Sequence, residues 1–163
     1  MSQRVVIHDA SVLIDLAAGG LLPDFGRLGW ESETTQLVLK EIQGEPRLLD
    51  WVSRHLQITV LSGDELIELR LSASKGLSNA DLSALYLARG RSGTLLTNDN
   101  RLRRQAEAAN VPYLGILGIM RHLHEARICT GKRLCEALDA MLEAGARLPE
   151  KDCESHRAGW RLG

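Results

Sequence analysis

The sequence predicts a three-layer α/β domain whose central sheet is mainly parallel and is flanked by helices. Short apolar runs alternate with stretches of helical periodicity, as expected when crossover helices join strands that are buried on both faces. Two of the runs, 5–7 and 94–97, are each followed by an aspartate and then by a helical pattern. A chain of 163 residues with 44% hydrophobic and 25% charged residues has the composition of one globular domain.

The first strand is expected at 5–7, where three β-branched residues are continuous, as in a strand covered on both faces. Apolar residues then recur at helical spacing over 11–18, which predicts a helix. Asp9 lies between these two elements. Ligands in open α/β sheets collect beyond the carboxyl ends of the strands, so Asp9 is a candidate site residue. It could also act only as the N-cap of the following helix.

The remaining elements follow from the same patterns in chain order. The stretch 21–30 is broken by proline and glycine and predicts a loop or a short helix. Helices are predicted where apolar residues recur at helical spacing, several of them after a Ser or Thr cap, at 34–43, 46–56, 63–74, 77–89, 100–109, 116–125 and 130–144. Short apolar or alternating runs predict further strands at 58–60, 94–97 and 111–114. The domain is expected to span 1–148, followed by a polar tail at 149–163 for which no element is predicted.

Charge and cysteine content argue against several classes of protein. The net charge is −1 and the isoelectric point is about 6.5, so any contact with nucleic acid must be local. Cys129, Cys135 and Cys153 are odd in number and form no CxxC motif, which argues against a disulfide framework or a zinc knuckle. No apolar run is long enough to cross a bilayer, and the N-terminus leads into a strand instead of a signal peptide. A cytoplasmic protein without a membrane partner is expected.

Four acidic residues lie at the ends of predicted elements or beside apolar stripes: Asp9, Glu41, Asp81 and Asp99. Gathered in one pocket, these carboxylates would repel one another, and their pKa values would rise until protons neutralised the cluster. A divalent cation such as Mg²⁺ or Mn²⁺ removes that conflict, because it binds carboxylate oxygens and retains several waters. The chemistry predicted for such a site is metal-assisted hydrolysis of phosphodiesters.

Four segments resemble the PIN-domain family, metal-dependent ribonucleases that include the VapC-type toxins of bacterial toxin-antitoxin pairs. In chain order they are DASVLIDL, VLKEI, LSNADLSALYLA and LLTNDNRLRRQA, and the resemblance covers about 5–117. It implies that Asp9, Asp81 and Asp99 hold Mg²⁺ or Mn²⁺, and that Glu41 helps to position the ion or the attacking water. It also implies an RNA substrate, a homodimer and a small antitoxin partner.

Neighbouring residues also match or depart from the family pattern. Ser11 and Thr97 correspond to hydroxyl residues beside the first and last acids, and the resemblance implies that they orient carboxylates or water. Asn98 stands where a second acid would adjoin the last one. A subgroup of PIN-like proteins, which the segment YLGILGIMRHLHEARI resembles, often has an acid where this chain has Ser83.

Several of these residues have a simpler interpretation. Asp81 and Asp99 could cap helices, and Glu41 could be a solvent-facing helix residue. Basic residues just after the last acid could contact RNA phosphates or form a solvated helix face; they are Arg101, Arg103 and Arg104.

Two further functions are therefore considered. One is a catalytically weak PIN-fold module that binds nucleic acid or protein, which the residues Ser83 and Asn98 favour. The other is a Mg²⁺-dependent phosphotransfer or receiver-like domain, because acids at strand ends also bind Mg²⁺ in such proteins. Ser11 stands where an aspartate-nucleophile phosphatase needs its second acid, which argues against that second alternative.

Overall fold

A computed structural model describes residues 3–72 and 76–162, and a five-stranded sheet organises the fold of these residues. The strands are β1 (Arg4–Ile7), β2 (Glu31–Thr35), β3 (Leu56–Thr59), β4 (Thr94–Leu96) and β5 (Tyr113–Leu114). All pairs are parallel, in the order β3-β2-β1-β4-β5. The chain order reverses between β1 and β4, and the carboxyl ends of strands at such a switch point flank the ligand crevice of doubly wound sheets.

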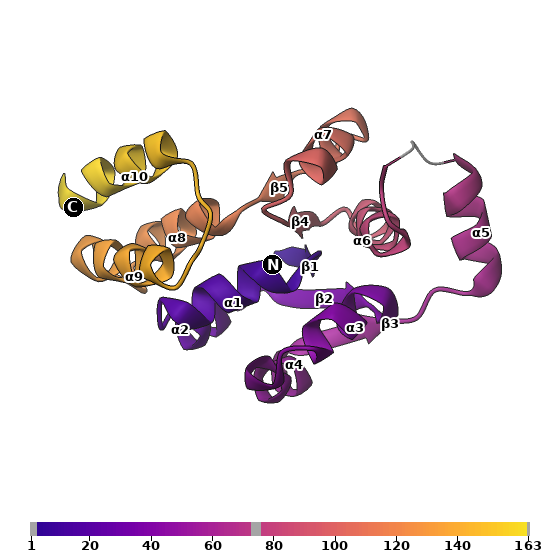
Figure 1. The fold of residues 1–163 in the computed structure, drawn as a ribbon, viewed down its shortest axis with the longest axis horizontal. Coiled ribbons are helices and arrows are strands. Elements are labelled where there is room, and N and C mark those ends of the chain that lie inside the picture. Colours follow the sequence, from indigo (N-terminus) through magenta and orange to yellow (C-terminus); the bar gives the residue numbers. More distant parts are fainter. Residues whose placement is uncertain (1–2, 73–75, 163) are drawn as a thin grey trace. The chain divides into compact units, whose positions relative to one another are not determined.

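Helices join these strands along the chain and follow the last of them. They are α1 (Ala10–Ala18), α2 (Leu22–Arg27), α3 (Gln36–Gln43), η1 (Pro46–Leu48), α4 (Leu49–His55), α5 (Gly63–Ser72), α6 (Asn79–Gly90), α7 (Asn100–Ala108), α8 (Ile116–Glu125), α9 (Gly131–Glu143) and α10 (Glu150–Leu162). Helices α3 and α4 lie beside β2 and β3, and α6 packs against β1, β2 and β4 (Figure 1). The predicted three-layer α/β fold is confirmed.

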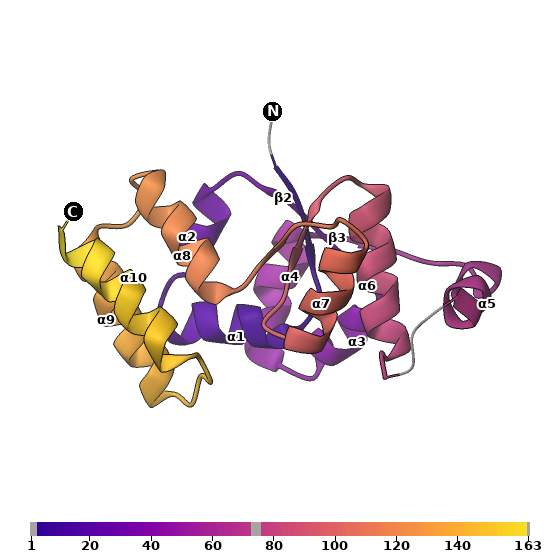
Figure 2. The same ribbon diagram turned by 90° about the horizontal axis from the view of Figure 1, so that it is seen from above.

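The chain forms two compact units. The first consists of Met1–Val12 and Trp30–Leu114, and the second of Leu13–Gly29 and Gly115–Gly163. The first unit contains every strand of the sheet together with Asp9, Glu41, Asp81 and Asp99. Within it, α6 lies between α5 and α7 (Figure 2). In the second unit, α10 packs against α8 and α9. In the described part of the chain, every helix is too short or too polar to cross a bilayer.

The strand β2 is the main difference from the predicted elements. A helix was expected from Thr34, but Glu31–Thr35 forms a strand, and Thr35 is the N-cap that accepts a hydrogen bond from the amide of Val38. That prediction was wrong because β2 contains no apolar residue. The buried hydroxyls of Thr34 and Thr35 instead form hydrogen bonds: Thr34 Oγ1 donates to the carbonyl of Ile7 at 2.7 Å, and Thr35 Oγ1 lies 2.8 Å from Oγ of Ser83.

A second polar side chain of β2 is held by an ion pair. The guanidinium of Arg91 donates to both carboxylate oxygens of Glu33, at 3.0 Å from Nε and 2.9 Å from Nη2, and the hydroxyl of Thr59 also donates to Glu33. Burial alone would raise the pKa of Glu33, but these hydrogen bonds and the charge of Arg91 hold it below the ordinary value of 4.5. The ionised carboxylate therefore stabilises the folded chain.

This ion pair predicts an acid-sensitive contribution to stability. Since the pKa of Glu33 is lower in the folded than in the unfolded chain, its contribution is complete above the ordinary pKa of 4.5 and is lost as the pH falls through the folded value. As the pH is lowered below 4.5, the free energy of unfolding, measured in urea, should therefore decrease more steeply for the wild type than for Glu33→Gln. Glu31→Gln, at an exposed acid that pairs with Arg4, should keep the wild-type slope. Equal slopes for all three proteins would contradict the prediction.

Smaller differences concern the other boundaries. The strand β3 is shifted toward the N-terminus relative to the predicted 58–60, and the predicted helix 46–56 divides into η1 and α4. Residues 73–74, the predicted end of the helix that begins at Gly63, lie outside the described residues. Most of the polar stretch 149–163, for which no element was predicted, forms α10.

Candidate functional site

The side chain of His8 lies at the centre of a polar cluster at the carboxyl ends of β1 and β4. Its backbone amide donates to the carbonyl of Leu96 at 3.1 Å, which continues the pairing of the two strands. Its ring is buried, with Nε2 at 2.6 Å from Oδ1 of Asp81 and Nδ1 at 2.8 Å from Oγ1 of Thr97. Nδ1 also lies 3.3 Å from Oδ2 of Asp9. One imidazole thus joins two of the four acids.

Asp9 is held in place by hydroxyl groups and by the start of α1. The hydroxyl of Ser11 and the amide of Val12, at 3.2 Å, both donate to Oδ1 of Asp9. The hydroxyl of Thr97 donates to Oδ2 at 3.4 Å. Asp9 therefore caps a helix and also contributes to the polar cluster.

Asp81 has the same double role at the start of α6. Its amide donates to Oγ of Ser78 at 3.0 Å, and its Oδ2 accepts from the amide of Ser78 at 2.8 Å, so the two residues form a capping box. The other carboxylate oxygen, Oδ1, faces His8. The capping interaction leaves one oxygen of Asp81 for the polar cluster.

Asp99 lies beside this cluster and is the N-cap of α7. Its Oδ1 accepts from the amides of Arg101, at 2.8 Å, and Leu102, at 3.2 Å, and the residue is exposed. Its own amide donates to Oγ1 of Thr97 at 3.0 Å. The hydroxyl of Thr97 thus connects Asp99 with Asp9 and His8. Asn98, which precedes Asp99, is half-buried.

Glu41 is not brought into the cluster by these hydrogen bonds. It lies on α3 and is exposed. Within residues 3–72 and 76–162, its carboxylate makes no ion pair. Glu41 stays a predicted site residue that the hydrogen bonds around His8 do not reach.

The three arginines after Asp99 have different surroundings. Arg103 donates from Nε and Nη2 to the carbonyl of Thr97, at 3.1 and 3.0 Å, and its guanidinium lies over the ring of Tyr113. Arg101 donates to the carbonyl of Gly76 at 3.0 Å, and it is exposed, as is Arg104. Arg103 therefore braces the turn between β4 and α7, whereas the other two face solvent.

The pKa values of the cluster follow from these contacts. Burial by itself would lower the pKa of His8, but hydrogen bonds to Asp9 and Asp81 and the charges of both acids raise it above its ordinary value. Burial would raise the pKa values of Asp9 and Asp81, and hydrogen bonds, first of all to His8, lower them instead. These directions together favour an imidazolium between two ionised carboxylates.

His8 was not among the predicted site residues. One signal could have found it: His8 is the polar residue that ends the apolar run 5–7, directly before Asp9. A polar side chain at the carboxyl end of a buried strand needs a hydrogen-bonding partner. The sequence does not indicate which residues supply that partner, because Asp81 and Thr97 are far away along the chain.

Comparison with known proteins establishes the family. A family model described as DUF3368, PIN domain, matches residues 5–158. The chain belongs to the PIN-domain family. The resemblance proposed from the sequence is confirmed at this level, and PIN domains are generally nucleases that bind nucleic acid and use divalent metals. No curated protein matches the chain.

Two solved structures share the fold of this PIN domain. One is a PilT N-terminus domain protein, SSO1118, from the hyperthermophilic archaeon Sulfolobus solfataricus P2, with 13% identity, a TM-score of 0.56, and coverage of 76% of this chain and 95% of that one. The other is PAE2754 from Pyrobaculum aerophilum, with 24% identity, a TM-score of 0.51, and coverage of 76% and 98%. At these identities the similarity concerns the fold alone.

PIN domains typically use a divalent cation, and the cluster around His8 contains side chains that could hold one. In the described ranges, 3–72 and 76–162, no three His, Cys, Asp or Glu side chains are grouped as a metal site. The donor chemistry of Asp9, Asp81 and Asp99 fits Mg²⁺ or Mn²⁺, which prefer carboxylate oxygens. In the observed arrangement, however, the ring of His8 contacts both Asp9 and Asp81. A cation bound to these two carboxylates would replace those contacts.

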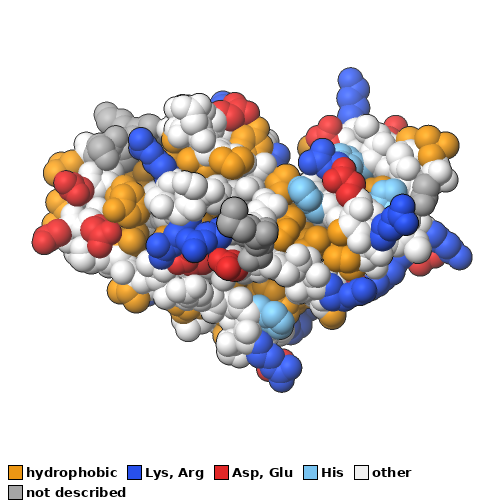
Figure 3. All heavy atoms as spheres, turned by 180° about the vertical axis from the view of Figure 1, so that it is seen from behind, with side chains coloured by type: hydrophobic (Ala, Val, Ile, Leu, Met, Phe, Trp, Pro, Cys, Tyr) orange, Lys and Arg blue, Asp and Glu red, His pale blue; other side chains and the backbone are white. Residues whose placement is uncertain are grey.

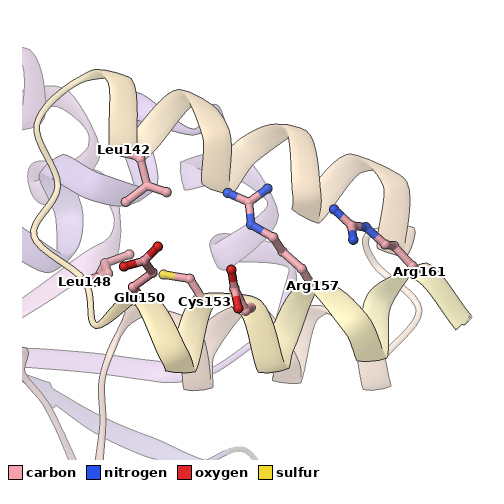
Figure 4. Close-up of a pocket in the computed structure, with 7 residues that line it drawn as sticks. Leu142, Leu148, Glu150, Cys153, Arg157 and Arg161 are labelled. Atoms are coloured by element: carbon pink, nitrogen blue, oxygen red, sulfur yellow. The ribbon is translucent and has the colours of Figure 1, made fainter.

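Two other features were considered as functional sites. A cavity of about 780 Å³ in the second unit lies between α9 and α10 and is lined by Leu142, Leu148, Glu150, Cys153, Glu154, Arg157 and Arg161 (Figure 4). None of the four predicted acids lines it. Figure 3 shows Lys and Arg side chains in several separate places on one face, with acidic and apolar side chains between them. The polar cluster around His8 therefore remains the candidate functional site.

Proposed function

We propose that this PIN domain is a metal-dependent ribonuclease that acts as the toxin of a toxin-antitoxin pair. The observation that carries the proposal is the convergence of Asp9, just after β1, and Asp81, at the start of α6, on the ring of His8 at the carboxyl ends of β1 and β4. Acids that converge at a switch point of a parallel sheet are suited to bind a cation and a phosphate.

In this proposal each acid has a separate task. Asp9, Asp81 and Asp99 hold Mg²⁺ or Mn²⁺, and when bound this ion activates water and stabilises charge on the phosphate. The hydroxyls of Ser11 and Thr97 fix the orientation of the Asp9 carboxylate.

More distant residues have supporting tasks. Glu41 acts from α3 on the position of the ion or the attacking water. Asn98 adds an amide next to the last acid. The exposed guanidinium groups of Arg101 and Arg104 contact RNA phosphates, which fix position without reading sequence. Arg103 contributes by holding the carbonyl of Thr97.

The biological setting of the proposal comes from the family resemblance. A toxin of this type works in the cytoplasm, forms a homodimer and is neutralised by a small antitoxin protein. Production of the chain without its antitoxin should stop growth of the host cell, and the same chain with Asp99→Asn should allow growth.

The direct test is cleavage of a mixed RNA pool by the purified chain with Mn²⁺ or Mg²⁺, with and without a chelator. Asp99→Asn is an informative variant, because asparagine can still cap α7 while the negative charge is lost. We expect cleavage with either cation, loss in chelator, and a rate roughly 10²-fold lower for the variant. Absence of any cation-dependent difference between the two proteins, with the fold intact and no copurified partner, would contradict the proposal.

A second candidate is a catalytically weak PIN-fold module that binds nucleic acid or protein. Ser83 favours it, because a buried hydroxyl stands where the resembling subgroup often has an acid. Its Oγ lies 2.8 Å from Oγ1 of Thr35 and donates to the carbonyl of Ala80, so it serves packing. RNA binding without cleavage in the same assay would favour this candidate.

A further inference from the structure

The ring of His8 lies where the proposed function needs a cation. Nε2 is 2.6 Å from Oδ1 of Asp81, and Nδ1 is 3.3 Å from Oδ2 of Asp9. An ionised carboxylate only accepts hydrogen bonds, so Nε2 donates its proton to Asp81. Only 4% of the His8 surface is exposed, and little water competes for these contacts.

The ring is also held from its other side. Oγ1 of Thr97 lies 2.8 Å from Nδ1 and accepts a hydrogen bond from the amide of Asp99. The carbonyl of Thr97 accepts two hydrogen bonds from Arg103. The imidazole is therefore held between the two acids and the hydroxyl of Thr97, which is itself fixed by hydrogen bonds. To leave this position, the ring must give up hydrogen bonds at both nitrogens.

The imidazole ring and a divalent cation would contact the same oxygens of Asp9 and Asp81. The ring and the ion therefore cannot occupy this position together. We infer that His8 is an internal competitor of the divalent cation, which enters between Asp9 and Asp81 only when the imidazole gives up its hydrogen bond to Asp81. This inference rests on the proposed metal-dependent function.

The competition lowers the apparent affinity of the site for metal. When the binding-competent state is only fractionally populated, the apparent dissociation constant rises by the inverse of that fraction. Molecules in which His8 bridges Asp9 and Asp81 are in the state that cannot bind the cation. Removal of the imidazole also frees the oxygens of Asp9 and Asp81 that the ring contacts, so that a cation can bind them.

The test is titration of the full chain with Mn²⁺ in a calorimeter. His8→Ala and His8→Asn both remove the bridge, and the asparagine variant keeps a polar side chain in case alanine prevents folding. His55→Asn is the matched control, because His55 lies on α4 and bonds to the carbonyl of Trp51. We expect both His8 variants to bind Mn²⁺ about tenfold more tightly than wild type, and the control to bind like wild type. Mn²⁺ should also raise the unfolding temperature of the His8 variants more than that of the wild type.

A spectroscopic measurement reports on the ring itself. In ¹⁵N-labelled protein without metal, the Nε2 proton of His8 should exchange slowly, because it is buried and bonded to Asp81. The resonance is assigned by its absence in His8→Asn. Saturation with Mg²⁺ should abolish it, whereas a purely structural histidine would keep it.

The outcomes separate the inference from the proposed function. Weaker binding by both His8 variants would make the imidazole a metal ligand and overturn the inference. If the His8 variants bind Mn²⁺ with the same affinity as the wild type, the inference is overturned and the metal-dependent function is not. Absence of Mn²⁺ binding in the wild type and in every folded variant would overturn the proposed function and the inference with it.

Discussion

Asp9→Asn is expected to lower the rate of RNA cleavage by about 10³-fold. The substitution removes one negative charge from the proposed cation site, and a cation at such a site stabilises the transition state by several kcal/mol. The substitution keeps the size of the side chain and an oxygen that can accept the bonds from Ser11 and Val12. The loss is therefore expected in the rate and not in the fold. Cleavage of labelled RNA under saturating Mn²⁺, together with thermal unfolding of the same samples, measures both.

One control variant and one further site variant sharpen this prediction. Asp64→Asn changes an exposed acid on α5 and should leave the rate within a factor of about two. Glu41→Gln should have an effect between those of the other two variants, because Glu41 is exposed and makes no hydrogen bond to the His8 cluster in the described part of the chain. A rate for Asp9→Asn equal to that of Asp64→Asn would remove Asp9 from the proposed site.

Gly131→Ala is expected to lower the free energy of unfolding by about 3 kcal/mol or more, at the upper end of the range for overpacking. A Cβ atom at Gly131, the first residue of α9, would lie 1.9 Å from the carbonyl oxygen of Trp160 and 2.7 Å from its carbonyl carbon. These are backbone atoms of α10, so they move only if the helix moves. Urea unfolding followed by tryptophan fluorescence measures the loss, since Trp160 is buried in the wild type.

The same helix offers a matched control for this substitution. Gly159 lies on α10, and a Cβ atom there would meet nothing within 4 Å. Gly159→Ala should therefore raise the free energy of unfolding by about 0.5–1 kcal/mol, because alanine is the better helix former. A wild-type unfolding curve for Gly131→Ala would show that α9 and α10 separate easily, and would contradict the close approach.

The fold class and most elements could be predicted because apolar periodicity determines them. The continuous apolar residues of β1 and the repeated order of strand, acid and helix were enough to predict a parallel α/β sheet. The strand β2 could not be predicted this way, since Glu33, Thr34 and Thr35 are buried through an ion pair and hydrogen bonds instead of apolar contacts. The helix α10 was missed for a related reason, because only Cys153 and Trp160 on it are buried.

Some residues of the candidate site could likewise be predicted from local sequence, and others could not. Asp9 and Asp99 could be singled out because each follows a predicted strand by one intervening residue, and local sequence is enough to place them. The capping box of Ser78 and Asp81 was also visible in the sequence. The bond from His8 to Asp81 was not, because it depends on how α6 lies across the ends of β1 and β4, and that placement is tertiary.

The strand order has a consequence for the chain during its own synthesis. The ribosome completes β1, β2 and β3 before it reaches α6 and β4, although β4 lies beside β1 in the sheet. A nascent chain that ends before residue 81 carries Asp9 and Glu41 but lacks the other two acids and the hydroxyl of Thr97. If the chain cleaves RNA as proposed, a nascent chain gains that ability only after α6, β4 and Asp99 have been translated, and a shorter nascent chain does not itself cut the transcript that encodes it.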